Sequence, residues 1–205
     1  MEQIKWEKVK TSRTEVIDII KALLALSFAF AVIYAGASFL RGSVENLFSV
    51  QFLFLFVISL CTAGLGFLLH ELSHKFVAQK YGCVAEFRAF DQMLFLAIGL
   101  ALALGFIFAA PGAVMISGMI TRRENGLVSV AGSVTNYVLG LLFLGAGWLF
   151  PLLLPITSIG FGINMWLGLF NMIPFGPLDG LKVFYWNKLV WAGMVAVGGY
   201  FVFFF

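Results

Sequence analysis

The most informative stretch of this chain is an apolar run that ends in two histidines: residues 52–74 read FLFLFVISLCTAGLGFLLHELSH. Residues 52–69 carry no charged side chain, and a run of this length predicts a helix that crosses a membrane. Ionisable groups at the end of such a helix are costly, so they are expected to have a functional role. Residues 70–74 are therefore the first candidate site.

His70 and His74 are the only histidines of the chain, and Glu71 lies between them. On an α-helix, residues i and i+4 share a face, so both imidazoles can reach one metal ion while Glu71 lies beside a metal-bound water. This spacing is typical of zinc hydrolases. A helix can also carry two histidines as ordinary polar or hydrogen-bonded core residues, but the membrane-length segment before them favours the metal site.

The composition places the chain in a lipid bilayer. Hydrophobic residues make up 61% of the 205 residues and charged residues 11%, whereas a soluble domain carries about 25% charged residues. We expect residues 1–205 to form one integral membrane domain, an all-α polytopic protein. The apolar runs predict about five transmembrane helices, at residues 22–40, 52–80, 127–150, 156–173 and 189–205. Residues 84–90 and 113–120 have the composition of short strands and predict a small β-hairpin or sheet.

The basic residues cluster in segments that the positive-inside rule assigns to the cytoplasm. These clusters are Lys5, Lys8, Lys10 and Arg13; Lys75 and Lys80; Arg122 and Arg123; and Lys182 and Lys188. If the N-terminus is cytoplasmic, only Arg41 of the 13 lysines and arginines faces outward. We therefore expect a multi-pass protein of the cell membrane, with its histidines towards the cytoplasmic side. The same distribution argues against a nucleic-acid partner, despite the net charge of +3.

A catalytic zinc site usually has three protein ligands and one open position, and the chain has no third histidine. The remaining ligand must then be an aspartate or a glutamate. Asp179 differs from the other carboxylates because it lies in residues 171–180, NMIPFGPLDG, where proline and glycine interrupt the helix. Such breaks at membrane depth are tolerated where the backbone faces protein or a cavity.

The histidine motif and the later Asn-x-x-Pro…Asp-Gly stretch together resemble the site-2 protease family of intramembrane zinc metalloproteases, over about residues 60–182. The resemblance implies one Zn²⁺ ion bound by His70, His74 and Asp179, with Glu71 activating the water. It also implies that Asn136 and Asn171 position the substrate, a single-span transmembrane protein. The chain departs from the family at residues 131–136, AGSVTN, where the family usually has Gly-Pro before the asparagine. The alternative for each asparagine is a helix–helix hydrogen bond.

A peptide bond within a transmembrane helix is shielded, and its carbonyl is already hydrogen-bonded. The substrate must therefore unwind locally, and strand 113–120 would replace the lost bonds by pairing with it. The alternative for this strand is an internal hairpin with residues 84–90, which still leaves one edge. Two other functions remain as alternatives. One is a different class of membrane zinc protease, which usually recruits a later glutamate; the other is a non-enzymatic metal-binding protein or scaffold, which needs no base beside the first ligand.

The apolar segment 92–110 is an addition to the simplest members of the family. It is long enough to span a membrane, but a single crossing would reverse every later span and place Asp179 on the opposite side from the two histidines. We therefore expect a re-entrant segment, which enters the membrane and returns on the cytoplasmic side. Its turn is expected near Gly99 or Gly105, with the broken backbone sheltered by the bundle.

Overall fold

The computed structural model of the chain describes residues 11–107 and 111–205. Lys5, Lys8 and Lys10, and the last three residues of the predicted re-entrant segment, lie outside the described residues. The helices are α1 (Arg13–Tyr34), α2 (Val50–Ser59), α3 (Leu65–Lys80), α4 (Asp91–Leu104), α5 (Arg122–Leu149), α6 (Leu154–Asn171), α7 (Asp179–Trp186) and α8 (Lys188–Phe203), and the strands are β1 (Val84–Ala89) and β2 (Gly112–Ser117). Short 3-10 helices cover Val44–Phe48 and Pro151–Leu153, and a π-helical turn covers Leu60–Gly64.

In the described part of the chain, four helical stretches are long and apolar enough to cross a membrane: Arg13–Tyr34, Val50–Lys80, Arg122–Leu149 and Pro151–Asn171. They correspond to the first four predicted spans. The fifth, predicted at 189–205, corresponds to α8, an apolar helix of only 16 residues. Within the described residues, the structure therefore confirms a mostly helical fold with four candidate membrane spans and a small sheet, but it does not confirm the count of about five.

Two predicted span boundaries differ from the helix ends in the structure. The first span was expected to reach residue 40, but α1 ends at Tyr34. Gly36 turns the chain with a φ of 61°, and the N–H groups of Phe39 and Leu40 donate to carbonyls at the end of α4. The third span was expected from residue 127, with a polar turn before it. That turn is the first turn of α5, closed by a capping box between Thr121 and Glu124.

The second span is one helical stretch of 31 residues, in which the π-helical turn joins α2 to α3. A π turn holds an extra residue and rotates the helical face that follows it. α1 packs tightly at this turn, because a Cβ on Gly64 would lie 2.6 Å from the hydroxyl oxygen of Ser27. The turn thus helps to determine which face of α3 carries the histidines.

Strands β1 and β2 form an antiparallel hairpin, which confirms the internal pairing. β2 ends at Ser117, earlier than the predicted residue 120. Ala89 pairs with Gly112, so the segment between the strands returns to the place where it leaves the hairpin. It turns at Gly105, which has a φ of 72°, whereas Gly99 lies within α4 and does not turn the chain.

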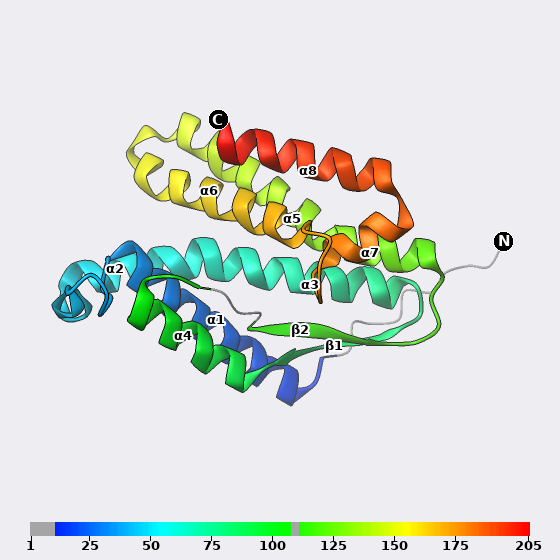
Figure 1. Cartoon of the computed structure of the whole chain (residues 1–205), viewed down its shortest axis with the longest axis horizontal. Coiled ribbons are helices and arrows are strands. Elements are labelled where there is room, and N and C mark those ends of the chain that lie inside the picture. The colour runs from blue at the N-terminus through cyan, green and yellow to red at the C-terminus, as the bar shows by residue number, and fades with distance from the viewer. Residues whose placement is uncertain (1–10, 108–110) are drawn as a thin grey trace.

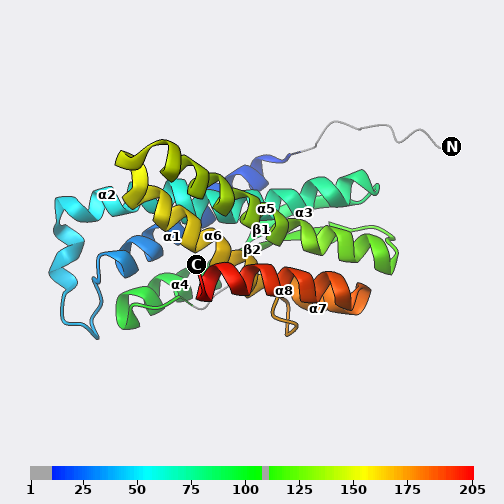
Figure 2. The same cartoon turned by 90° about the horizontal axis from the view of Figure 1, so that it is seen from above.

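The helices stack in layers around α3 (Figure 1). α5, α6 and α8 lie on one side of α3, while α1, α4 and the hairpin lie on the other. α5 runs antiparallel to α3, since Val128 contacts His74 whereas Asn136, two turns further on, contacts Gly66. α6 in turn runs antiparallel to α5, with Gly147 near Thr157 and Gly140 near Met165. α3 and α6 therefore point the same way, and Figure 2 shows α5 and α6 lying over α3.

A buried ion pair that the sequence did not reveal ties α1 to α3. The ammonium group of Lys75 donates to both carboxylate oxygens of Glu15, at 2.7 and 2.6 Å, and both side chains are buried. Glu15 also accepts the backbone N–H of Phe87 in β1 at 3.0 Å. Loss of one partner of such a pair leaves an uncompensated charge. The pair therefore holds the hairpin and α1 against the residue that directly follows His74.

Candidate metal centre

α3 and α7 supply the side chains of the candidate centre. His70 and His74 lie one turn apart on the same face of α3, Glu71 directly follows His70, and Asp179 is the first residue of α7. Because α6 runs parallel to α3, the loop after α6 delivers Asp179 to the C-terminal half of α3. This approach needs Gly180, where an added Cβ would lie 2.2 Å from the carbonyl oxygen of Met172.

The two imidazoles and the Asp179 carboxylate converge. Asp179 Oδ2 lies 3.4 Å from His70 Nε2 and 3.0 Å from His74 Nε2. All three side chains are buried. Ligand atoms around a tetrahedral zinc ion lie roughly 3.3 Å apart, given bonds of about 2.0–2.2 Å. The distances from Asp179 Oδ2 to the two Nε2 atoms are therefore those expected between ligand atoms of such a site.

Each imidazole is oriented through its other ring nitrogen. His74 Nδ1 lies 2.8 Å from the carbonyl oxygen of Val128, and His70 Nδ1 lies 2.6 Å from Asn136 Oδ1. An oxygen acceptor at Nδ1 places the ring proton there and leaves Nε2 with a free lone pair. Both Nε2 atoms, which face Asp179, are thus in the form that binds a metal.

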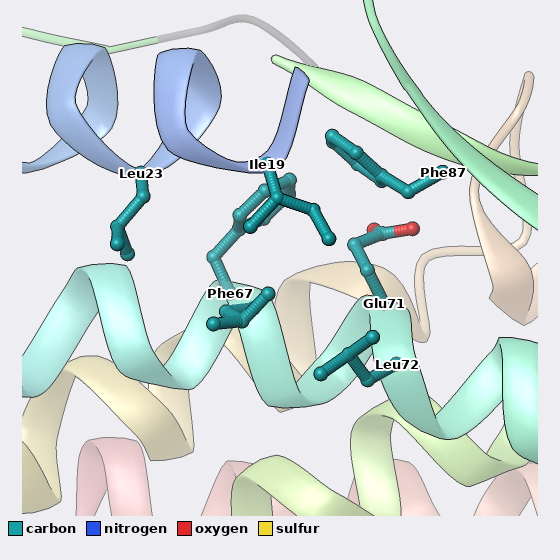
Figure 3. A pocket seen from close by; sticks show the side chains of 7 residues that line it. Ile19, Leu23, Phe67, Glu71, Leu72 and Phe87 are labelled. Atoms are coloured by element: carbon teal, nitrogen blue, oxygen red, sulfur yellow. The ribbon is translucent and has the colours of Figure 1, made fainter. Parts of the chain in front are cut away.

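Glu71 lies beside these three side chains. One of its carboxylate oxygens and one ring nitrogen of each histidine lie within 4.8 Å of one another. Its Oε2 accepts the backbone N–H of Val114 in β2 at 3.1 Å. Figure 3 shows the carboxylate pointing from α3 towards the hairpin, next to an apolar recess lined by Ile19, Leu23, Phe67 and Phe87 among others. The hairpin thus holds one oxygen of Glu71 and leaves the other for a water molecule.

Comparison with curated proteins decides the family. Over 193 residues the chain is 40% identical to a protein of Methanocaldococcus jannaschii named "Putative zinc metalloprotease MJ0611", and the match covers 91% of this chain and 93% of that protein. The chain belongs to this zinc metalloprotease family. A second protein of the same organism, zinc metalloprotease MJ0392, is 28% identical over 161 residues, which are 75% of this chain and 38% of the relative. No family model matches the chain. No solved structure matches it either.

The residues present fit the zinc ion that a metalloprotease of this family requires. Two imidazole nitrogens and a carboxylate oxygen are ordinary zinc ligands, and three of them leave one position for water or substrate. The space is kept open by Gly132 on α5, where an added Cβ would lie 2.5 Å from His70 Nε2 and 2.6 Å from His74 Nε2. His70, His74 and Asp179 are therefore the residues that would hold the ion.

The electrostatics of the metalloprotease centre favour an ionised Asp179. Burial raises the pKa of its carboxyl group, but the charge of a protonated His74 and the hydrogen bonds that protonated imidazoles donate outweigh this effect and hold the pKa below its usual range. With the ring protons on Nδ1 instead, the positive charge beside Asp179 would come from the zinc ion. Its second oxygen, Oδ1, lies 3.6 Å from the ammonium group of Lys182, an exposed side chain one turn further along α7. The carboxylate is thus held in the form that binds a metal, with Oδ2 aimed at the histidines.

The two predicted asparagines differ in their surroundings. Asn136 is fully buried on α5 and contacts His70 directly. Asn171 is half-buried at the end of α6, where its amide donates to the carbonyl oxygen of Leu167 in its own helix. Within residues 11–107 and 111–205, the hydrogen bonds of the Asn171 side chain do not reach the metalloprotease centre. A third asparagine, Asn164, was not expected from the sequence and donates nothing to the centre itself, but it accepts a hydrogen bond from Asn136 at 3.0 Å.

Proposed function

We propose that this metalloprotease is an intramembrane zinc endopeptidase of the site-2 protease class, which hydrolyses peptide bonds within or near transmembrane segments. One observation carries the proposal. His70, Glu71 and His74 lie on a helical stretch, Val50–Lys80, that is long and apolar enough to span a membrane, and Asp179 converges on the two histidines. A site built into such a helix acts on substrates that are themselves in the bilayer. The proposed substrates are single-span transmembrane proteins.

Glu71 is the proposed general base. When bound, zinc supplies a Lewis acid that lowers the pKa of a coordinated water and polarises the scissile carbonyl. Glu71 takes the proton from the attacking water through the oxygen that Val114 leaves free, and passes it to the leaving amine. Asn136 and Val128 hold the two imidazoles while this happens. A metal carrier or scaffold has no use for a base in this position, which is the reason to prefer an enzyme.

The outer edge of β2 is the proposed site for the unwound substrate. Phe87 and Val114 face each other across the hairpin, and their N–H groups point outward, to Glu15 on one side and Glu71 on the other. The edge of β2 therefore faces the base. A substrate strand added to this edge gains main-chain hydrogen bonds in place of its helical ones, which brings its backbone to Glu71. Asn171, near the loop that carries Asp179, keeps its proposed role in substrate positioning.

The experiment uses purified protein in lipid bilayers together with tagged single-span membrane proteins. Cleavage of at least one substrate within or next to its span is expected, with loss of cleavage on addition of a zinc chelator and recovery on addition of Zn²⁺. A matched substrate whose span carries leucines in place of its helix-breaking residues should be cut more slowly, because it unwinds less readily. Cleavage of soluble unfolded peptides alone would overturn the intramembrane proposal. Zinc binding with no cleavage of any substrate would favour the metal-binding scaffold.

We further propose that the protein is multi-pass, with its N-terminus and its metal centre towards the cytoplasm. The start of α1 contacts β1 through Ser12 and Glu86, and the hairpin connects the end of α3 to the start of α5. The helix ends that carry Arg13, Lys80 and Arg122 therefore gather at one end of the bundle, whereas Arg41 follows α1 at the other end. This distribution follows the positive-inside rule and gives segment 92–110 a path that enters and leaves on one side.

Cysteine labelling tests this topology. Arg88→Cys and Arg123→Cys, each in a background that lacks Cys61 and Cys83, should both react with a membrane-impermeant reagent from the cytoplasmic side only. Arg41→Cys is the matched control, because this exposed residue at the opposite end should react from the outside only. The fraction labelled in intact cells and in inverted vesicles is the measurement. Labelling of Arg88→Cys and Arg123→Cys from opposite sides would refute the re-entrant path of segment 92–110.

A further inference from the structure

Asn164 lies where α3, α5 and α6 meet. Its side chain is fully buried. Its Oδ1 accepts from Asn136 at 3.0 Å, and its Nδ2 donates to the carbonyl oxygen of Gly160, one turn earlier in α6, at 2.8 Å. α3 approaches this amide so closely that a Cβ on Gly66 would lie 2.3 Å from Asn164 Oδ1. A buried amide between three helices, with both its oxygen and its nitrogen hydrogen-bonded, needs an explanation beyond packing.

The hydrogen bonds of Asn136 leave its amide one orientation. Its NH₂ group has two protons, and they go to the carbonyl oxygen of Gly66 at 3.1 Å and to Asn164 Oδ1 at 3.0 Å. Oδ1 of Asn136 must then face His70 Nδ1, 2.6 Å away. This oxygen only accepts, so the proton of the ring lies on Nδ1 and Nε2 keeps its lone pair.

A flip of the Asn136 amide would reverse this result. Its NH₂ group would then face His70 Nδ1, and the ring proton would move to Nε2, where it blocks a metal. The flip would also place Asn136 Oδ1 next to two other acceptors, the carbonyl oxygen of Gly66 and Oδ1 of Asn164, with which it cannot form a hydrogen bond. His74 has no such dependence, because its partner is the carbonyl oxygen of Val128, which cannot donate in any orientation. The two ligands therefore differ in what determines their tautomer.

We propose that Asn164 is a positioning residue for the zinc centre, acting through Asn136 to set the tautomer and the ring orientation of His70. Among the hydrogen bonds of the described residues, none joins Asn164 to His70, His74 or Asp179. Its effect is indirect. By accepting a hydrogen bond from Asn136, it disfavours the flipped orientation of the Asn136 amide, which contacts His70. The inference rests on the proposed ligation of zinc by His70.

The test replaces Asn164 with leucine, which has a similar size and no acceptor. The zinc dissociation constant of Asn164→Leu, measured by competition with a chelator, should rise about 10- to 100-fold, as for other groups that orient a ligating histidine. Thr157→Val is the matched control: this buried residue of the same helix donates to the carbonyl oxygen of Leu154 in its own helix, and its loss should leave the zinc affinity unchanged. Asn164→Ala, a simple truncation, checks that the effect does not come from the bulk of leucine.

A second readout separates positioning from general loosening of the fold. The chain has only two histidines, so zinc-loaded protein with a spin-active nitrogen isotope in its histidines gives signals from two imidazoles. In Asn164→Leu the Nδ1 signal of His70 should move while that of His74 stays. Asn164→Asp, whose neutral acid can both accept from Asn136 and donate to Gly160, should restore the affinity to within a few fold of the wild-type value.

Two outcomes are decisive. Wild-type zinc affinity in Asn164→Leu, with an unchanged His70 signal, would overturn the role of Asn164 and leave the proposed function standing. Equal shifts of both imidazole signals would also overturn it, since they would show a general structural effect. If zinc changed the signal of neither histidine in the wild-type protein, the proposed function itself would fail.

Discussion

Glu71→Gln is expected to keep its zinc and to lose its cleavage of membrane substrates. The carboxamide has the size of the carboxylate and can still accept the N–H of Val114, so the hairpin and the ligands stay in place. It cannot take a proton from water. Loss of a general base lowers the rate by about 100- to 10,000-fold. Metal analysis of purified protein and the cleavage rate in lipid bilayers measure the two effects separately.

The ligand variants provide the contrast. His70→Ala, His74→Ala and Asp179→Ala should each lose both zinc and cleavage, because each removes one corner of the site. Glu45→Gln, an exposed carboxylate at the opposite end of the bundle, should keep both. Full proteolysis by Glu71→Gln would exclude Glu71 as the base. Retention of zinc by Asp179→Ala would exclude Asp179 as the third ligand and leave Glu71, which lies close to both histidines, as its replacement.

Gly132→Ala is expected to weaken zinc binding strongly without changing any proposed ligand. The added Cβ would lie 2.5 Å from two ring atoms of His70 and 2.6 Å from His74 Nε2. The rings cannot simply move away, because Asn136 and Val128 hold them from behind. Overpacking of this kind costs about 1–3 kcal/mol. At about 1.4 kcal/mol for each factor of ten, the zinc dissociation constant should rise about 5- to 150-fold, and cleavage at limiting zinc should fall in parallel.

Gly145→Ala is the matched control for this prediction. It lies on the same helix, and an added Cβ there would meet no atom within 4 Å. Both variants make the same change of helix propensity, so any difference between them comes from the contacts of the methyl group. Chelator competition on the two purified proteins gives the zinc affinities. Equal affinities for Gly132→Ala and the wild-type protein would show that the imidazoles do not pack against α5 as described.

The apolar runs and the motifs were sufficient to predict most of the architecture. A stretch without charges long enough for a bilayer has few alternatives to a membrane helix, and the first four spans were found in this way. The apolar runs did not predict the exact ends of the helices. Residues 35–40 continue the hydrophobic pattern of α1, but the carbonyls of α4 bind the N–H groups of Phe39 and Leu40. The start of α5 had a readable signal, because Thr121 and Glu124 have the spacing of a capping box.

The sequence by itself determined the chemical groups of the centre. Two histidines four residues apart and an aspartate in a helix break are the proposed zinc ligands, and they could be named because ligand identity depends on residue type and local spacing. The tertiary structure alone decided how these groups are supported. Val114 binds Glu71, Asn136 binds His70, and Asn164 binds Asn136. Each of these pairs joins two different elements through residues at least 28 positions apart. Each also depends on how the elements are rotated against one another, which local patterns do not specify.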